Sequence, residues 1–111
     1  ILLGEWEAFL GESELRLFRQ DRDEMALHRA AKHCSLALTA YDRYSPHIIR
    51  QSRRTRTRFY DLLKRMSSET LSNFYAIVAE VEAQLGFTET IMSQFLVDQF
   101  GPAESHIVIE L

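Results

Sequence analysis

The sequence predicts an all-α fold, a single-domain bundle of four to five helices with short loops, with or without a short C-terminal strand. Its 111 residues fit one domain, and the 46% share of hydrophobic residues is enough to form a core. Only four glycines and two prolines interrupt the chain, so its elements are few and long. We therefore expect residues 1–111 to form one helical domain, either as a trimmed chain or as a fragment of a longer protein.

Two helices are expected before residue 45. Apolar residues among the first ten follow helical spacing, and Gly11 is the expected end of that first helix. Ser13 is then the N-cap of a second helix that runs to about Tyr41. The polar run at residues 19–24 is either a break in this helix or a solvated turn of it. The expected core side of the second helix consists of Leu15, Phe18, Met25, Ala30, Ala31, Cys34, Leu38 and Tyr41.

The third and fourth helices have clear start and stop signals. Ser45 followed by Pro46 favours a helix start, because proline suits the first helical turn, and the third helix should run from there to about Met66. The serine pair at 67–68 offers a cap for a fourth helix that ends near residue 85. Gly86 is then a natural left-handed stop, with Phe87 packing back on the last turn.

The last third of the chain predicts one more helix and a short strand. Thr88 is the expected cap of a fifth helix, which ends before Gly101. The tail at residues 106–111 alternates between two sets of side chains, and this period favours a strand over a helix. An isolated strand needs a partner, which a second copy of the chain would supply.

Charge is divided sharply along the chain. Residues 1–27 hold seven acidic and three basic residues, a net charge of −4. Residues 28–66 hold ten basic and two acidic residues, a net charge of +8, and residues 67–111 hold seven acidic residues and no lysine or arginine. This distribution indicates charged contacts, either within the chain or with a partner.

The third helix carries the candidate binding residues. At 100° per residue its apolar side chains fall on one face and most of its basic side chains on the other, with Arg56 to one side. The expected core face consists of Ile48, Ser52, Thr55, Phe59, Leu62, Leu63 and Met66. The candidate partner-binding residues on the opposite face are Arg50, Arg53, Arg54, Arg58, Lys64 and Arg65.

This basic face has several interpretations. It is a solvated face that pairs loosely with the acidic flanking helices, a surface for an acidic protein or a second copy of the chain, or a surface for nucleic-acid phosphates. A role at a membrane surface is the least favoured. Arginine favours a specific acidic partner, because guanidinium groups bind carboxylates and phosphates with two parallel hydrogen bonds. We expect a non-catalytic interaction or regulatory module that self-associates or docks an acidic protein surface.

Residues 81–96, VEAQLGFTETIMSQFL, resemble the helix-turn-helix signature of bacterial DNA-binding proteins. Val81, Leu85, Gly86 and Phe87 occupy matching places, and the resemblance implies that Thr88 caps the second helix while Met92 and Phe95 face the core. The chain departs from the pattern at Glu82, where the family usually has alanine. The resemblance implies a nucleic-acid-binding transcriptional regulator, the alternative function. The expected recognition helix contains Glu89 and Asp98 and no basic residue, so the arginine helix would have to contact the phosphates.

Other chemistry lacks support in the sequence, so we expect neither an enzyme nor a cofactor. No glycine-rich phosphate loop is present, and Glu24 and His28 share a face without a third metal ligand. Two arginine–histidine pairs resemble the motif of HEPN-type ribonucleases, but three residues separate each pair where that family has four to six.

Cys34 is the only cysteine, which favours an intracellular setting and a buried, inert thiol. No apolar run is long enough to cross a membrane, and no signal peptide is recognisable at the start.

Overall fold

The computed structural model describes residues 3–44 and 49–103, which form five helices and no strand within those ranges. The all-α bundle that the sequence predicts is therefore confirmed. The helices are α1 (Leu3–Asp21), α2 (Glu24–Tyr44), α3 (Ile49–Leu63), α4 (Ser68–Gln84) and α5 (Ile91–Phe100). The tail expected to form a strand lies outside the described residues.

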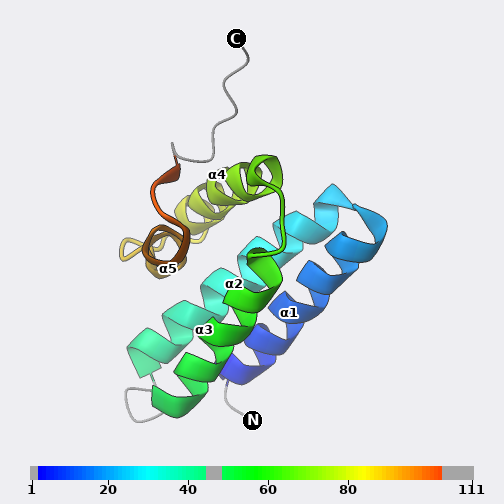
Figure 1. Cartoon of the computed structure of the whole chain (residues 1–111). Coiled ribbons are helices and arrows are strands. Elements are labelled where there is room, and N and C mark those ends of the chain that lie inside the picture. The colour runs from blue at the N-terminus through cyan, green and yellow to red at the C-terminus, as the bar shows by residue number, and fades with distance from the viewer. Residues whose placement is uncertain (1–2, 45–48, 104–111) are drawn as a thin grey trace.

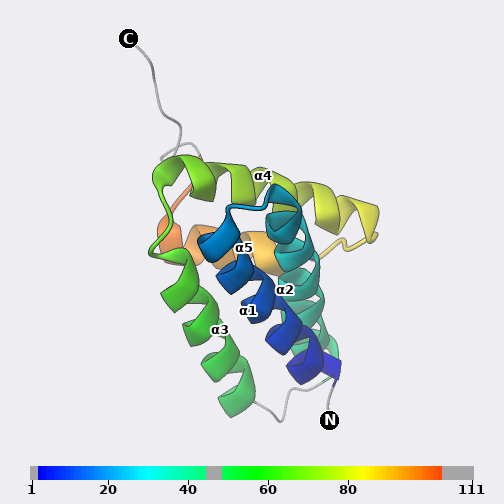
Figure 2. The same ribbon diagram turned by 90° about the vertical axis from the view of Figure 1, so that its right-hand side faces the viewer.

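The helices form a long hairpin with three helices packed around it. Helices α1 and α2 lie antiparallel against each other, and α3 runs alongside them (Figure 1). Helix α4 crosses the end of this layer, with α5 beneath it and against α2 (Figure 2). Helix α3 packs on the bundle with one side only, so the opposite side of this helix faces solvent (Figure 2).

Small residues allow α1 and α2 to approach closely. Gly11 lies in the middle of α1, and a Cβ atom placed on it would lie 2.8 Å from the Sγ atom of Cys34 on α2. The expectation that Gly11 ends a helix is therefore wrong, because this glycine makes room for the neighbouring helix. Ser13 is not an N-cap either, since its hydroxyl donates to the carbonyl oxygen of Phe9 within the same helix.

The true break between α1 and α2 falls in the polar run at residues 19–24. Arg22 adopts a left-handed φ of 56°, which ends α1. The carboxylate of Asp23 accepts a hydrogen bond from the N–H of Met25 and so caps the start of α2. Met25 lies in this first turn with 61% of its surface exposed, so its predicted core position is wrong.

The ends of α4 are confirmed as the sequence predicts them. The Ser67 hydroxyl accepts a hydrogen bond from the N–H of Thr70 at the start. Gly86 has a φ of 73° at the other end, and the N–H of Phe87 donates to the carbonyl oxygen of Glu82. This is the backbone pattern of a glycine-terminated helix.

Helix α5 begins later than the sequence predicts. Thr88 does not cap it, because Thr90 occupies that position with a left-handed φ of 43° and no side-chain hydrogen bond. The carboxylate of Glu82 replaces the missing cap: it accepts hydrogen bonds from the N–H of Met92 at 3.2 Å and from the hydroxyl of Ser93. Helix α5 ends at Phe100 before Gly101, as expected.

One core runs through the bundle and joins all five helices. Its largest fully buried apolar side chains are Phe59, Phe74, Phe95, Leu15, Leu38, Leu63, Met92 and Leu96. Helix α3 contributes Phe59, Leu62 and Leu63, and Tyr60 stacks on Phe100 at 5.3 Å between ring centroids. The apolar face of α3 is therefore used by the fold, and only its basic face is open to a partner.

Candidate functional site

Helix α3 places most of the predicted basic residues on its solvent side. Thr55, Phe59, Leu62 and Leu63 are buried, which confirms the core face for these positions, while Ser52 is half-buried. The helix ends at Leu63 instead of continuing to about residue 66, so the last two predicted basic residues lie in the following turn. We call the exposed arginines Arg50, Arg53, Arg54, Arg58 and Arg65 the arginine ridge.

Most of the arginine ridge has no acidic partner in the part of the chain that the structure describes. Arg58 lies 3.7 Å from the carboxylate of Glu12 on α1. Arg50, Arg53, Arg54 and Arg65 form no ion pair with any residue in 3–44 or 49–103. Within the described ranges, the hydrogen-bond donors of these four exposed arginines are therefore not used by a carboxylate of the chain.

Lys64 and Arg56 differ from the arginine ridge in their contacts. Lys64 pairs with Asp61 at 3.2 Å and lies over the ring of Tyr60, so its charge is already partly used. Arg56 lies over the ring of Phe95 at 5.9 Å and is half-buried, which agrees with its predicted place to one side of the basic face. Lys64 was a predicted partner-binding residue, and its contacts differ from those of the ridge arginines that have no ion pair among the described residues.

A cleft lies between the outer sides of α1 and α3. Its volume is about 560 Å³, and its walls include Arg58 and Arg65 beside Arg16 and Arg19 of α1. The two α1 arginines are not among the residues predicted to bind a partner, because they lie in a segment that is acidic overall. Arg16 and Arg19 follow Glu12 by four and seven residues, and this helical spacing indicates that the three side chains share one face of the helix.

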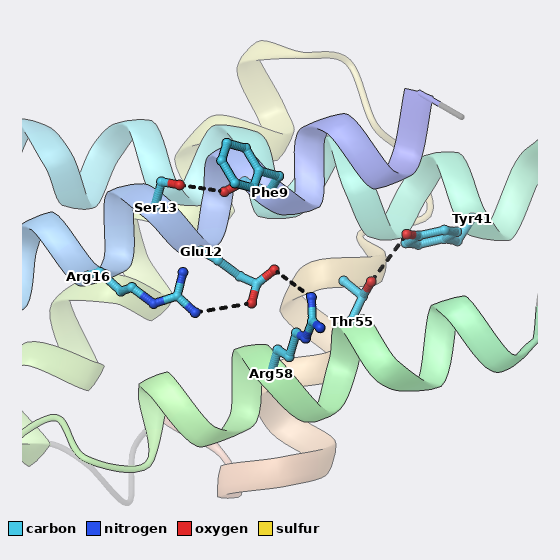
Figure 3. Close-up of polar contacts among 7 residues, drawn as sticks. All are labelled: Phe9, Glu12, Ser13, Arg16, Tyr41, Thr55 and Arg58. Carbon is cyan, nitrogen blue, oxygen red and sulfur yellow. Dashed lines mark hydrogen bonds and ion pairs between the residues drawn. The ribbon is translucent and has the colours of Figure 1, made fainter. Parts of the chain in front are cut away.

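Glu12 forms the floor of this cleft and is only 5% exposed. Figure 3 shows its carboxylate between the guanidinium groups of Arg16 and Arg58, each at 3.7 Å. Burial raises the pKa of Glu12 above the usual value of a glutamate, although both arginines act in the opposite direction. These ion pairs are long, so the two guanidinium groups can still receive a stronger acceptor.

A smaller hollow continues along the same two helices. Its volume is about 160 Å³, and Phe9, Arg54 and Arg58 are among the residues that line it. The hydroxyl groups of Tyr41 and Thr55 lie 3.2 Å apart beneath it and link α2 to α3 (Figure 3). Of the predicted binding residues, Arg54, Arg58 and Arg65 line one or both of these hollows, whereas Arg50, Arg53 and Lys64 line neither.

The remaining candidate residues have structural roles. His33 lies 2.5 Å from the carboxylate of Glu7, so it joins α2 to α1. No group of three or more metal-ligating side chains occurs among the described residues. Cys34 is fully buried, and burial raises the pKa of its thiol, which confirms it as a small core residue.

The segment that resembles a helix-turn-helix forms two helices with a longer connection than that motif uses. Residues 85–90 separate α4 from α5, whereas a helix-turn-helix has a turn of about three to four residues. Glu82, the departure from the pattern, is fully buried and holds the start of α5. Glu89 and Asp98 are exposed on this part of the chain.

Comparison with protein-family models, with curated proteins and with solved structures yields no significant match. None of the helices in residues 3–44 and 49–103 has the length and apolar character required to span a bilayer. The arginine ridge and the cleft beside it are therefore the features from which a function can be inferred.

Proposed function

We propose that this chain is a non-catalytic helical interaction module that docks an acidic protein surface through the arginine ridge. The observation that carries the proposal is the set of four exposed ridge arginines without a carboxylate partner among the described residues. Like charges one helical turn apart, such as Arg50 and Arg54, repel each other by a few tenths of a kcal/mol. The row therefore weakens the isolated helix slightly, which is consistent with a role in binding.

The chemistry of arginine favours a carboxylate-bearing partner. A guanidinium group offers a rigid pair of N–H donors that fits both oxygens of one carboxylate. Arg58 and Arg65 line the cleft, and Arg54 lines the smaller hollow beside it. A partner that enters the cleft therefore also meets the guanidinium groups of Arg16 and Arg19 on α1. The partner is another protein or a second copy of this chain, whose exposed acidic residues after position 66 include Glu69, Glu80, Glu89 and Asp98.

Nucleic-acid binding by the arginine ridge is the second candidate. Each arginine that neutralises a phosphate releases a counterion, so the same row of exposed arginines favours this function too. Helix α5 adds no basic residue, and Asp98 on this helix and Glu89 just before it would repel a phosphate backbone. A nucleic acid would therefore have to bind through the arginine ridge and the cleft beside it, without a contribution from α5.

Binding measurements with three probes test these candidates. The probes are a labelled glutamate-rich peptide, a labelled DNA duplex and a labelled single strand, each titrated at low and at high salt. We expect the peptide to bind at low salt, to weaken as salt increases, and to lose binding with the triple variant Arg50/Arg54/Arg65→Glu. Lys32→Glu, which reverses an exposed charge on α2, is the control and should leave peptide binding almost unchanged.

Two results would contradict the proposal. Failure of the peptide to bind at low salt would contradict the docking of an acidic protein surface. Preferential binding of either DNA would favour nucleic-acid binding by the arginine ridge. Light scattering addresses the source of the acidic surface: an oligomer that persists in the triple variant would show that self-association does not depend on the arginine ridge.

A further inference from the structure

Helix α1 exposes an aromatic pair beside the cleft. Trp6 is 50% exposed and Phe9 is 57% exposed, and their rings stack with centroids 5.9 Å apart. Two large aromatic side chains that cover each other only partly leave an apolar patch in water, and such patches mark interaction sites. Tryptophan and arginine are also the residues that dominate the energy of protein–protein interfaces.

The smaller hollow between α1 and α3, which we call the groove, has Phe9 of the aromatic pair on one side and two residues of the arginine ridge on the other. Phe9 lines the smaller hollow from α1, while Arg54 and Arg58 line it from α3. Trp6 extends the aromatic side because its ring stacks on Phe9. The groove therefore has a basic side on α3, and its side on α1 carries the aromatic pair together with the carboxylates of Glu5 and Glu12. An element with one apolar and one acidic face fits it when the apolar face covers the aromatic pair and the acidic face lies toward α3.

We propose that the groove between α1 and α3 binds an amphipathic acidic helix from another protein. Its apolar side chains pack on Phe9 and Trp6, and its carboxylates pair with Arg54 and Arg58. This inference rests on the proposed function and specifies the partner: acidity alone is insufficient, and an apolar face is also required. Helical spacing supplies both, since residues three or four apart share a face.

The charges along the groove favour a peptide over a nucleic acid. Aromatic side chains next to arginines also suit stacked bases, so a single strand is the main competitor. Glu5 and Glu12, however, line the same hollow as Phe9. A continuous phosphate backbone would meet these carboxylates, whereas a helix places its acidic side chains toward α3 only.

The chain's single tryptophan provides a direct measurement, because Trp6 lies in the proposed site. The probe is a tryptophan-free helical peptide with leucines on one face and glutamates on the other. Two control peptides replace either the leucines by glutamines or the glutamates by glutamines. We expect only the first peptide to produce a saturable blue shift of the Trp6 emission, because burial against leucines removes water from the indole ring.

Two adjacent arginines form a matched pair of variants. Arg54 and Arg53 are both exposed on α3, but only Arg54 lines the groove. Arg54→Glu should raise the Kd of the peptide about tenfold or more, and Arg53→Glu, with the same change in charge, about twofold. Phe9→Ala should weaken binding about tenfold as measured by anisotropy of the labelled peptide.

Each outcome of this experiment decides a separate point. The proposal that the groove binds an amphipathic helix would be contradicted if the glutamate-bearing peptide without leucines bound equally well. It would also be contradicted if Arg53→Glu and Arg54→Glu had equal effects. Both results would leave docking of an acidic surface by the arginine ridge intact. No binding by any acidic peptide would overturn both proposals. A blue shift of Trp6 emission with single-stranded DNA alone would show that the groove binds a nucleic acid. A blue shift that increases with protein concentration in the absence of peptide would show that it binds a second copy of the chain.

Discussion

Glu82 is a fully buried carboxylate that joins α4 to the first turn of α5. The N–H groups at the start of a helix lack partners within the helix and attract negative charge. Thr90 cannot supply the missing acceptor, because its side chain forms no capping hydrogen bond. The residue that departs from the helix-turn-helix pattern is therefore the residue that fixes the start of α5 in this fold.

Replacement of Glu82 by alanine should lower the free energy of unfolding by about 2–4 kcal/mol, because it leaves buried donors without an acceptor and opens a cavity. Glu80→Ala is the matched control, since Glu80 is exposed on the same helix and should change stability by less than about 0.5 kcal/mol. Urea unfolding followed by circular dichroism measures both. Equal stability of the two variants would contradict the capping role of Glu82.

The raised pKa of Glu12 predicts a dependence of stability on pH. Between the ordinary pKa of a glutamate and the raised pKa of Glu12, the folded state holds more protons than the unfolded state. The contribution of Glu12 to stability is therefore complete below that window and is lost as pH rises through it. Glu12→Gln should remove this part of the pH dependence, as measured by urea unfolding at a series of pH values. If the free energy of unfolding changed with pH in the same way for the parent and for Glu12→Gln, this role of Glu12 would be contradicted.

At the scale of the helices, local signals predict ends better than they predict packing. The Ser67 cap and the Gly86 stop of α4 are confirmed because each depends on residues only a few positions apart. Gly11 was misinterpreted because its role depends on Cys34, which lies on another helix. The cleft could not be predicted for the same reason. The arginines of α3 form a recognisable pattern in the sequence, whereas the positions of Arg16 and Arg19 beside them depend on the packing of α1 on α3.

The close approach of α1 and α2 predicts an unusual response to alanine. Alanine is favoured over glycine by about 1 kcal/mol within a helix, yet Gly11→Ala should lower the free energy of unfolding by about 1–3 kcal/mol, because the new methyl group would collide with Cys34. The double variant Gly11→Ala/Cys34→Ala should recover part of the loss, since it removes the Sγ atom. Thermal unfolding of the three proteins decides the point: a single variant more stable than the parent would show that the contact is not tight.

At the scale of the whole molecule, the three charged segments neutralise each other only in part. Arg29 pairs with Glu14 at 3.0 Å, and Arg43 pairs with Glu89 at 3.6 Å, so α2 uses basic residues to hold acidic neighbours. The arginine ridge of α3 contributes only the long contact between Arg58 and Glu12 among the described residues. The fold therefore uses charges of α2, whereas most of the arginines on α3 have no carboxylate partner among the described residues.

The most direct test of this account measures whether the arginine ridge serves the fold. The triple variant Arg50/Arg54/Arg65→Gln removes three charges without reversing them, and its free energy of unfolding can be compared with that of the parent in urea at low salt. We predict a value within about 0.5 kcal/mol of the parent or slightly higher, because exposed unpaired charges add little and repulsion is relieved. A loss of about 2 kcal/mol or more would show that these arginines stabilise the bundle and would contradict their assignment to a partner.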